Sequence, residues 1–233
     1  MSASTPESSI EPRRLQPSAV LREHPVIAVL RARDPRDYDA VLDVLAENGV
    51  RSVELTLSTP GTIEHLLSLV GRGGAGGTSG GGAIEIGIGT VTNVEQAQRA
   101  IDAGADYLVT PVTRLDIVAL AVAAGVPVYP GGLTPSELFS GWEAGATAVK
   151  IFPAETVGSQ YGAHLRGPFP DIEFVPSGGV SLEDIPGWLR AGAVAVSLGG
   201  PLIGDALKGG SLDALAERTR RVVEVVAETR SAR

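Results

Sequence analysis

The sequence predicts an α/β fold, a single (β/α)8 barrel of the TIM type that is preceded by a short N-terminal helix. Eight short apolar runs alternate with helical stretches, a pattern typical of a parallel sheet covered by helices. Glycine recurs at helix ends just before the apolar runs, as at Gly104, Gly125 and Gly145, which are spaced by 21 and 20 residues. Eight compact units of one strand and one helix favour a closed barrel, with a doubly wound open sheet as the alternative.

The predicted strands and helices follow one another in chain order. Apolar and β-branched residues between Gly or Pro favour strands at residues 25–30, 50–57, 84–88, 107–110, 126–129, 146–153, 172–175 and 194–198. Helical spacing of apolar residues predicts helices at residues 17–22, 35–47, 59–70, 93–103, 113–124, 134–144, 181–191 and 212–228. After the strand at residues 146–153, the stretch up to residue 166 is expected to be helical or irregular. Thr134 and Glu137 have the spacing of a capping box, which marks one helix start.

One domain accounts for most of the chain. Its 233 residues, 43% of them hydrophobic, are enough for a full core, and no change of composition divides them. Residues 1–14 are polar and rich in Ser and Pro, so we expect a disordered tail, with the barrel at residues 15–233. The glycine-rich residues 71–83 lack the lysine of a phosphate-binding loop, and we expect an inserted surface loop there.

Composition excludes several classes of function. The net charge of −8 argues against a general affinity for nucleic acid or for an anionic membrane, so an anionic substrate needs locally placed cations. Without cysteine the chain has no disulfide, thiolate or cysteine-ligated metal. We see neither a signal peptide nor an apolar run long enough to span a bilayer, so a cytoplasmic protein is expected. The three histidines, His24, His65 and His164, lie apart, and we predict no metal site and no cofactor.

Lys150 is the one charged residue inside the apolar run at residues 146–153. It is one of only two lysines among the 19 Lys and Arg residues of the chain. A buried ammonium is costly, burial can lower a lysine pKa by ~3–5 units, and a neutral amine attacks carbonyl carbon atoms. We therefore predict a catalytic amine at Lys150, the alternative being a lysine whose stem is buried and whose head reaches solvent or a carboxylate.

Several residues with polar side chains or accessible backbone groups share the predicted carboxyl ends of the strands with Lys150, where barrels of this type carry their active sites. They are Arg31, Glu54, Thr56, Thr90, Thr110, Pro111, Ser177, Gly178, Gly179, Gly199 and Gly200. Arg31 could bind a substrate carboxylate, or pair with an acidic neighbour on the rim. Thr90 could add a hydroxyl to that carboxylate, or bond to its own loop. The glycines suit phosphate binding through N–H groups, or simply tight turns.

These groups suit imine chemistry at a ketone. An iminium formed at Lys150 accepts electrons, so the bond between the first and second carbon atoms beyond it breaks readily, provided that a base moves protons. Glu85 and Glu173 lie at the starts of their strands, away from the predicted site, which leaves Glu54 as the base. The alternative for Glu54 is an ion pair with an arginine or with Lys150; burial raises a carboxyl pKa and a cationic partner lowers it.

The motifs resemble those of the 2-keto-3-deoxy-6-phosphogluconate (KDPG) and 4-hydroxy-2-oxoglutarate (KHG) aldolases. The resemblance covers about residues 24–228, in family order. It rests on Val-Leu-Arg-Ala at residues 29–32, Val-Glu-Leu-Thr at 53–56, Gly-Ile-Gly-Thr-Val at 87–91, Thr-Pro at 110–111, Pro-Gly at 130–131, Lys-Ile-Phe-Pro-Ala-Glu at 150–155, Gly-Pro-Phe-Pro at 167–170 and Pro-Ser-Gly-Gly-Val at 176–180.

The resemblance implies a metal-independent class I aldolase that forms a homotrimer. In it Lys150 forms the Schiff base, Glu54 moves protons, and Arg31 and Thr90 hold the pyruvate carboxylate. It also implies a substrate site that includes Pro111, Phe152 and Ser177, with phosphate near Gly178, Gly179, Gly199 and Gly200. The expected substrates are small 2-keto-3-deoxy acids, cleaved to pyruvate and an aldehyde such as glyceraldehyde 3-phosphate, or to glyoxylate from KHG.

Two positions depart from the family pattern. Ser58 stands where some members carry arginine, and Pro201 stands where some carry a phosphate-binding serine. The alternatives to KDPG cleavage are a phosphogalactonate-type aldolase, a phosphosugar isomerase or epimerase that uses Glu54 as its base, and a binding protein in which Lys150 pairs permanently with Glu54.

Overall fold

The computed structural model describes residues 14–71 and 84–232. The predicted tail up to residue 13 and the predicted glycine-rich loop beyond residue 71 lie outside the described residues. Arg14, which the prediction assigned to the tail, donates hydrogen bonds of 2.6 Å to the carbonyl oxygens of Trp142 and Ala146. Its guanidinium carbon lies 3.6 Å from the centre of the Trp142 ring, so the chain is already packed against the fold at this residue.

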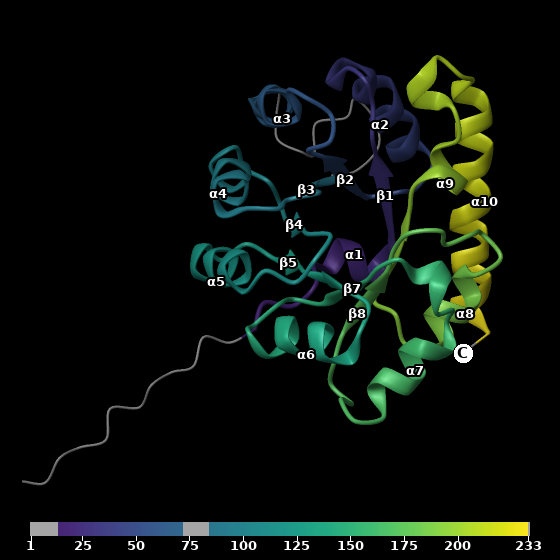
Figure 1. Ribbon diagram of the computed structural model, residues 1–233. Coiled ribbons are helices and arrows are strands. Elements are labelled where there is room, and N and C mark those ends of the chain that lie inside the picture. Colours follow the sequence, from purple (N-terminus) through teal and green to yellow (C-terminus); the bar gives the residue numbers. More distant parts are fainter. Residues whose placement is uncertain (1–13, 72–83, 233) are drawn as a thin grey trace, which may run out of the picture.

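The strands form two parallel sheets that curl around a common interior (Figure 1). The larger sheet has the order β5-β4-β3-β2-β1-β9 and the smaller one the order β6-β7-β8. Their bounds are β1 (Val26–Leu30), β2 (Ser52–Thr56), β3 (Glu85–Gly89), β4 (Leu108–Val109), β5 (Val128–Tyr129), β6 (Gly131–Gly132), β7 (Val149–Ile151), β8 (Phe174–Pro176) and β9 (Val196–Leu198). The predicted alternation of parallel strands with helices is therefore confirmed.

Hydrogen bonds connect the two sheets at two places. On one side, β5 and β6 flank Pro130, and the carbonyl oxygen of Pro130 accepts a 2.8 Å hydrogen bond from the Lys150 N–H. On the other side, a parallel bridge joins Ser177 to Ser197. The prediction of eight strands in one sheet differs here because proline, which has no N–H, interrupts the ladder between two short strands where one strand was expected.

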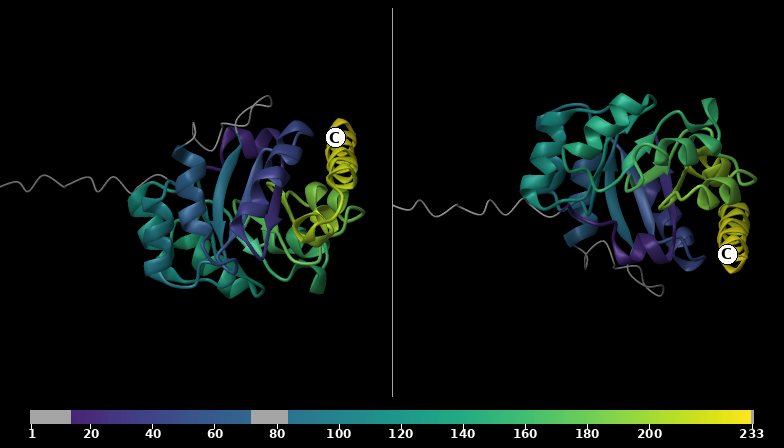
Figure 2. Two further views of the ribbon diagram at one scale, coloured as in Figure 1. Left: turned by 90° about the horizontal axis from the view of Figure 1, so that it is seen from above. Right: turned by 90° about the horizontal axis from the view of Figure 1, so that it is seen from below.

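Helices surround the curled sheets, as the three views show (Figures 1 and 2). The α-helices are α1 (Ala19–Glu23), α2 (Tyr38–Glu47), α3 (Thr62–Gly71), α4 (Val94–Asp102), α5 (Leu115–Ala124), α6 (Pro135–Glu143), α7 (Gln160–Arg166), α8 (Ile185–Arg190), α9 (Gly200–Ile203) and α10 (Leu212–Ser231). Three 3₁₀ turns are η1 (Pro35–Asp37), η2 (Ala154–Thr156) and η3 (Ala206–Lys208). The sequence did not predict α9 and η3, which connect the last strand to the last helix. None of the helices in the described residues is long and apolar enough to cross a membrane.

The two-residue period of the strands separates an outer core from an inner face. On β2, Val53 and Leu55 pack into the large core beneath the helices, so Glu54 between them points to the inside. On β7, Val149 and Ile151 do the same, and Lys150 points inward. A second apolar cluster fills one end of the interior and includes residues of α1, β1 and the strands opposite: Leu21, Ile27, Tyr107, Val109, Tyr129, Ala148, Val175 and Ala195. The interior is thus closed by apolar packing at one end and lined by polar groups at the other.

Candidate active site

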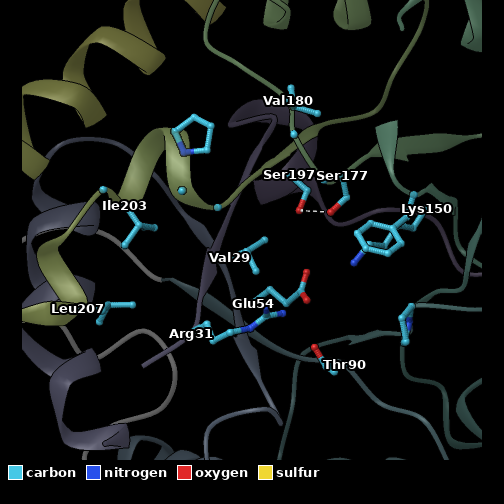
Figure 3. Close-up of a pocket in the computed structure, with 18 of the residues that line it drawn as sticks. Val29, Arg31, Glu54, Thr90, Lys150, Ser177, Val180, Ser197, Ile203 and Leu207 are labelled. Atoms are coloured by element: carbon cyan, nitrogen blue, oxygen red, sulfur yellow. Dashed lines mark hydrogen bonds between the residues drawn. The ribbon is translucent and has the colours of Figure 1, made fainter. Parts of the chain in front are cut away.

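A cavity of about 470 Å³ lies at the carboxyl ends of the strands (Figure 3). The eleven residues to which the sequence analysis gave a catalytic or substrate-binding role line it: Arg31, Glu54, Thr90, Pro111, Lys150, Phe152, Ser177, Gly178, Gly179, Gly199 and Gly200. They come from seven different strands or the loops that follow them. Strand ends that meet at one edge of the fold thus bring these residues together. Thr56 and Thr110, which the sequence analysis placed at the same strand ends, do not line the cavity.

Lys150 reaches the cavity from the middle of β7. Its side chain has only 8% of its surface exposed, and its neighbours in the ladders are Gly131 and Val175. The Nζ atom lies 5.0 Å from the centre of the Phe152 ring and points into the cavity (Figure 3). No ion pair of Lys150 with any described carboxylate occurs, so the alternative in which it pairs permanently with Glu54 does not match the geometry.

Glu54 faces the same cavity from β2 and is 2% exposed. In Figure 3 its carboxylate points up into the space toward which the Lys150 amine also points. The neighbouring strand β3 makes room for it, because a Cβ atom added at Gly89 would lie 1.9 Å from the Oε1 atom of Glu54. Only glycine at position 89 lets this carboxylate lie flat against β3.

Tyr107 lies beneath Glu54 in the interior. A Cβ atom at Gly87, two residues before Gly89 on the same face of β3, would lie 2.1 Å from the Tyr107 ring. Burial raises the pKa of the Tyr107 hydroxyl well above its usual value, and the charge of Glu54 raises it further. The neighbouring Tyr129 ring meets Tyr107 edge-on at 5.5 Å, and its pKa is also raised by burial. The Tyr107 ring thus forms an aromatic floor near the Glu54 carboxylate, and the Tyr129 ring packs against it.

Arg31 and Thr90 lie beside Glu54 at the ends of β1 and β3. Arg31 is exposed and lines the cavity, and within the described residues its guanidinium forms no ion pair. Thr90 has a φ of 60°, a left-handed backbone that a β-branched residue adopts only where its surroundings enforce it. Ser58, at the position that departs from the family pattern, has its hydroxyl 2.8 Å from that of Thr56, which in turn donates to the Leu30 carbonyl oxygen.

The loops after β8 and β9 contribute two glycine pairs to the cavity wall, Gly178 with Gly179 and Gly199 with Gly200. Gly178 and Gly179 both have left-handed backbones, with φ of 84° and 73°. A Cβ atom would lie 2.9 Å from the Phe152 ring at the first and 2.1 Å from the Glu155 carboxylate at the second. Within the described residues neither glycine N–H donates a backbone hydrogen bond, so both remain free for a ligand.

Pro201, which the resemblance placed at a phosphate-binding position, also lines the cavity, and seven further residues of its wall were not foreseen: Val29, Val180, Ser197, Ile203, Gly204, Leu207 and Lys208. The Ser197 hydroxyl lies 3.3 Å from that of Ser177. Strand alternation is the signal that could have found Val29 and Ser197, because both lie on the inner face of their strands. Leu207 and Lys208 lie in the unpredicted η3 turn, where no periodicity applies.

The histidines lie outside this cavity. The Nε2 atom of His65 lies 2.7 Å from the Oδ1 atom of Asp39, and neither residue lines the cavity. In the described parts of the chain, no three His, Asp or Glu side chains gather in a way that could hold a metal ion. The ionisable side chains that line the cavity are Arg31, Glu54, Lys150 and Lys208.

Comparison with known proteins gives one family. The model of the KDPG and KHG aldolases matches residues 18–218. The 2-dehydro-3-deoxy-6-phosphogalactonate aldolase of Escherichia coli K12 is 34% identical over 76% of this chain and 84% of its own length. The 2-dehydro-3-deoxy-phosphogluconate aldolase of Pseudoalteromonas atlantica is 32% identical over 88% of this chain and 92% of its own length.

A solved structure agrees with these relatives. The KDPG aldolase of Legionella pneumophila, with pyruvate captured as a covalent carbinolamine, superimposes with a TM-score of 0.79. It is 26% identical, over 89% of this chain and 98% of its own. These relatives are aldolases, so the isomerase or epimerase alternative is not favoured. The chain belongs to the KDPG and KHG aldolase family and is a carbon–carbon lyase.

Proposed function

We propose that this protein is a class I aldolase that reversibly cleaves 2-keto-3-deoxy-6-phosphogluconate to pyruvate and glyceraldehyde 3-phosphate. One observation carries the proposal. A buried amine, Lys150, and a buried carboxylate, Glu54, point into the same cavity without forming an ion pair with each other. An amine and a base held apart in this way suit the formation of an imine followed by proton transfer. The carbinolamine in the Legionella pneumophila relative is the addition product of an amine and pyruvate, which supports the same first step here.

The proposed reaction begins when the Lys150 Nζ atom attacks the C2 carbonyl carbon of the substrate. The carbinolamine that forms loses water and becomes an iminium. The C4 hydroxyl then gives up its proton, the C3–C4 bond breaks, and its electron pair moves into the iminium to form an enamine. The aldehyde leaves, C3 takes a proton, and water returns to release pyruvate and free Lys150.

Glu54 is the group that we assign to these proton transfers. Its carboxylate is held over Gly89 and the aromatic floor of Tyr107, so it cannot move away toward β3. Its carboxylate points into the part of the cavity toward which the Lys150 amine also points (Figure 3), and we place C3 and C4 of the substrate there. A positioned base of this kind contributes roughly 10²–10⁴-fold to a rate.

The pyruvate half is proposed to bind beside β1 and β3. The guanidinium of Arg31 is free of ion pairs among the described residues and suits a two-pronged contact with the C1 carboxylate. The strained backbone of Thr90 presents that residue at the same edge. Pro111 and Phe152 supply apolar surface next to Lys150.

The phosphate is proposed to bind to the glycine wall formed by Gly178, Gly179, Gly199 and Gly200, with the Ser177 hydroxyl nearby. The free N–H groups of Gly178 and Gly179 support this assignment. The E. coli relative acts on a phosphogalactonate, which differs from the gluconate in stereochemistry, and that substrate is the second candidate. KHG is a third, since the family model includes KHG aldolases.

We further propose that the two sheets form one closed (β/α)8 barrel in a single domain from residue 15 to 233. The hydrogen bond from Lys150 to Pro130 and the bridge between Ser177 and Ser197 support this view. A homotrimer in the cytoplasm is our remaining proposal. Exposed apolar side chains at the starts of α4 and α5, namely Val94, Val112 and Leu115, offer a contact surface for other copies of the chain.

A cleavage assay tests the proposed function. Pyruvate release is measured from the phosphorylated gluconate, the phosphorylated galactonate, KHG and the unphosphorylated gluconate. We expect release from at least the first substrate, and its loss in Lys150→Met, which keeps the apolar stem and removes the amine. A protein that folds but releases no pyruvate from any of the four would refute the proposal.

A further inference from the structure

The side of the cavity opposite Lys150 is built by the segment that follows β9. Ile203 of α9 and Leu207 of η3 are both buried and line this side. Figure 3 shows them across the cavity from Lys150, with Val29, Glu54 and Arg31 between. The cavity therefore extends beyond the groups assigned to pyruvate, and its outer part has an apolar wall.

Lys208 stands at the edge of this apolar wall. It is exposed, it lines the cavity, and it follows Leu207 directly in the η3 turn. Among the described residues its ammonium group forms neither a hydrogen bond nor an ion pair. An unpaired ammonium beside an apolar wall keeps its donors available to a ligand that enters the cavity.

The charges of the cavity show what such a ligand would carry. Beside the reacting amine of Lys150, Arg31 and Lys208 are the cations that line it among the described residues, and Glu54 is the anion. The cavity is thus cationic in a chain whose net charge is −8. Arg31 and Lys150 serve the carboxylate and the carbonyl of the pyruvate half, which leaves Lys208 for a second anionic group.

The wall between the glycines and Lys208 offers little else to an anion. Pro201, which lies on this wall, has neither a backbone N–H nor a side-chain donor. Ile203 and Leu207 are apolar. A negatively charged terminus that reaches past the glycine pairs therefore meets Lys208 as its charged donor.

We infer that Lys208 is a specificity-determining residue that binds the terminal anionic group of the aldehyde half. This inference rests on the proposed aldolase function and adds the residue that selects the substrate class. Its ligand chemistry is a phosphate or a carboxylate at the end of the substrate chain. A substrate with a neutral hydroxyl at that end gains nothing from the ammonium.

Three variants test the inference. Lys208→Met removes the charge and keeps the apolar stem, Lys208→Arg keeps the charge, and Arg190→Gln removes a charge from the exposed surface of α8, away from the cavity. For each variant kcat/KM is measured with the phosphorylated gluconate, with KHG and with the unphosphorylated gluconate. The number of active sites is fixed by the pyruvate that borohydride traps.

We expect Lys208→Met to lower kcat/KM for the phosphorylated gluconate about tenfold, mainly through KM, since charge-assisted hydrogen bonds are the strong ones. The value for the unphosphorylated acid should change less than about twofold, on the same grounds, because it offers no charge to the ammonium. Lys208→Arg should restore most of the loss, and Arg190→Gln should resemble the wild type. The change in kcat/KM for KHG shows whether a terminal carboxylate can take the place of the phosphate at Lys208.

An equal loss on charged and neutral substrates, or no loss on either charged substrate, would overturn the inference. These outcomes differ from a failure of the proposed function. If the wild type traps no pyruvate and cleaves none of the acids, the aldolase proposal itself fails. If it traps and cleaves normally while Lys208→Met discriminates as the wild type does, only the role of Lys208 is wrong.

Discussion

Gly89 and Glu54 lie so close together that a methyl group on Gly89 would collide with the Glu54 carboxylate. A Cβ atom at Gly89 would lie 1.9 Å from the Oε1 atom of Glu54 and 2.4 Å from its carboxyl carbon. No side chain at position 89 fits unless the carboxylate moves out of its place over β3. The position of the proposed base is therefore set by a neighbour that contributes no functional group.

Gly89→Ala is predicted to remove most of the activity. The methyl group displaces the Glu54 carboxylate, and we expect kcat to fall by about 10² because even a displacement of about 1 Å has an effect of this size. The measurement is the rate of pyruvate release, with thermal unfolding recorded alongside it. Gly125→Ala is the matched control: at Gly125 a Cβ atom meets nothing within 4 Å and only the left-handed φ of 69° is strained. It should lose about 1 kcal/mol of stability and keep its activity. Near-normal kcat in Gly89→Ala would show that Glu54 is not held as described.

Glu54→Gln is predicted to separate imine formation from proton transfer. The amide keeps the shape of the side chain but cannot take up a proton, so turnover should fall by about 10²–10⁴-fold. Solvent deuterium entering the methyl group of pyruvate measures the transfer directly. That exchange should slow in proportion, while borohydride still traps pyruvate on Lys150. Exchange at the wild-type rate would assign the base to another group.

Tyr107→Phe is predicted to stabilise the protein. The hydroxyl of Tyr107 is buried and has no hydrogen-bond partner among the described residues. A buried polar group without a partner costs about 1–3 kcal/mol, so the variant should unfold at a higher urea concentration, with a gain of about 1 kcal/mol. The ring, and with it the floor under Glu54, is retained. A less stable Tyr107→Phe would mean that the hydroxyl has a favourable partner.

The capping box at the start of α6 gives a pH-dependent contribution to stability. The carboxylate of Glu137 accepts hydrogen bonds from the N–H groups of Leu133 and Thr134 and from the Thr134 hydroxyl. The bonds from Thr134, and then that from Leu133, lower the pKa of Glu137. A lowered pKa means that the folded state favours the ionised form, so this stability is present above the pKa of the unfolded chain and is lost as the pH falls through the lowered value.

We therefore expect Glu137→Gln to be less stable than the wild type at pH 7, with a difference that disappears in acid. Urea unfolding from pH 7 to pH 3 measures it. Thr134→Ala, which removes the capping hydroxyl, should lose about 1 kcal/mol, whereas Ser136→Ala in the same turn should lose little. A difference between Glu137→Gln and the wild type that stayed constant with pH would contradict the lowered pKa.

Much of the site was predictable because it lies on strands. The two-residue period places Glu54 and Lys150 on the inner face, and the rule for parallel strands places their carboxyl ends together. The same period applied to Val29 and Ser197 would have added both to the site. Pro130 was correctly expected at a strand end. Whether its missing N–H interrupts the hydrogen bonds between strands depends on which strand lies beside it, and only the assembled sheet shows this.

The segment after β9 could not be predicted in the same way. Ile203, Leu207 and Lys208 lie in α9 and η3, which are too short to show a periodicity. Their place on the cavity wall follows from packing against residues far away in the chain. Sequence patterns therefore found the groups assigned to the reaction and missed the wall that we assign to substrate selection.

The most direct measurement for the central claim is the mass of the Lys150 peptide after incubation of the protein with pyruvate and borohydride. This peptide should carry a reduced pyruvyl group, and Lys150→Ala should prevent both the labelling and the cleavage. An unlabelled Lys150 peptide, together with a Lys150→Ala protein that still releases pyruvate, would contradict it.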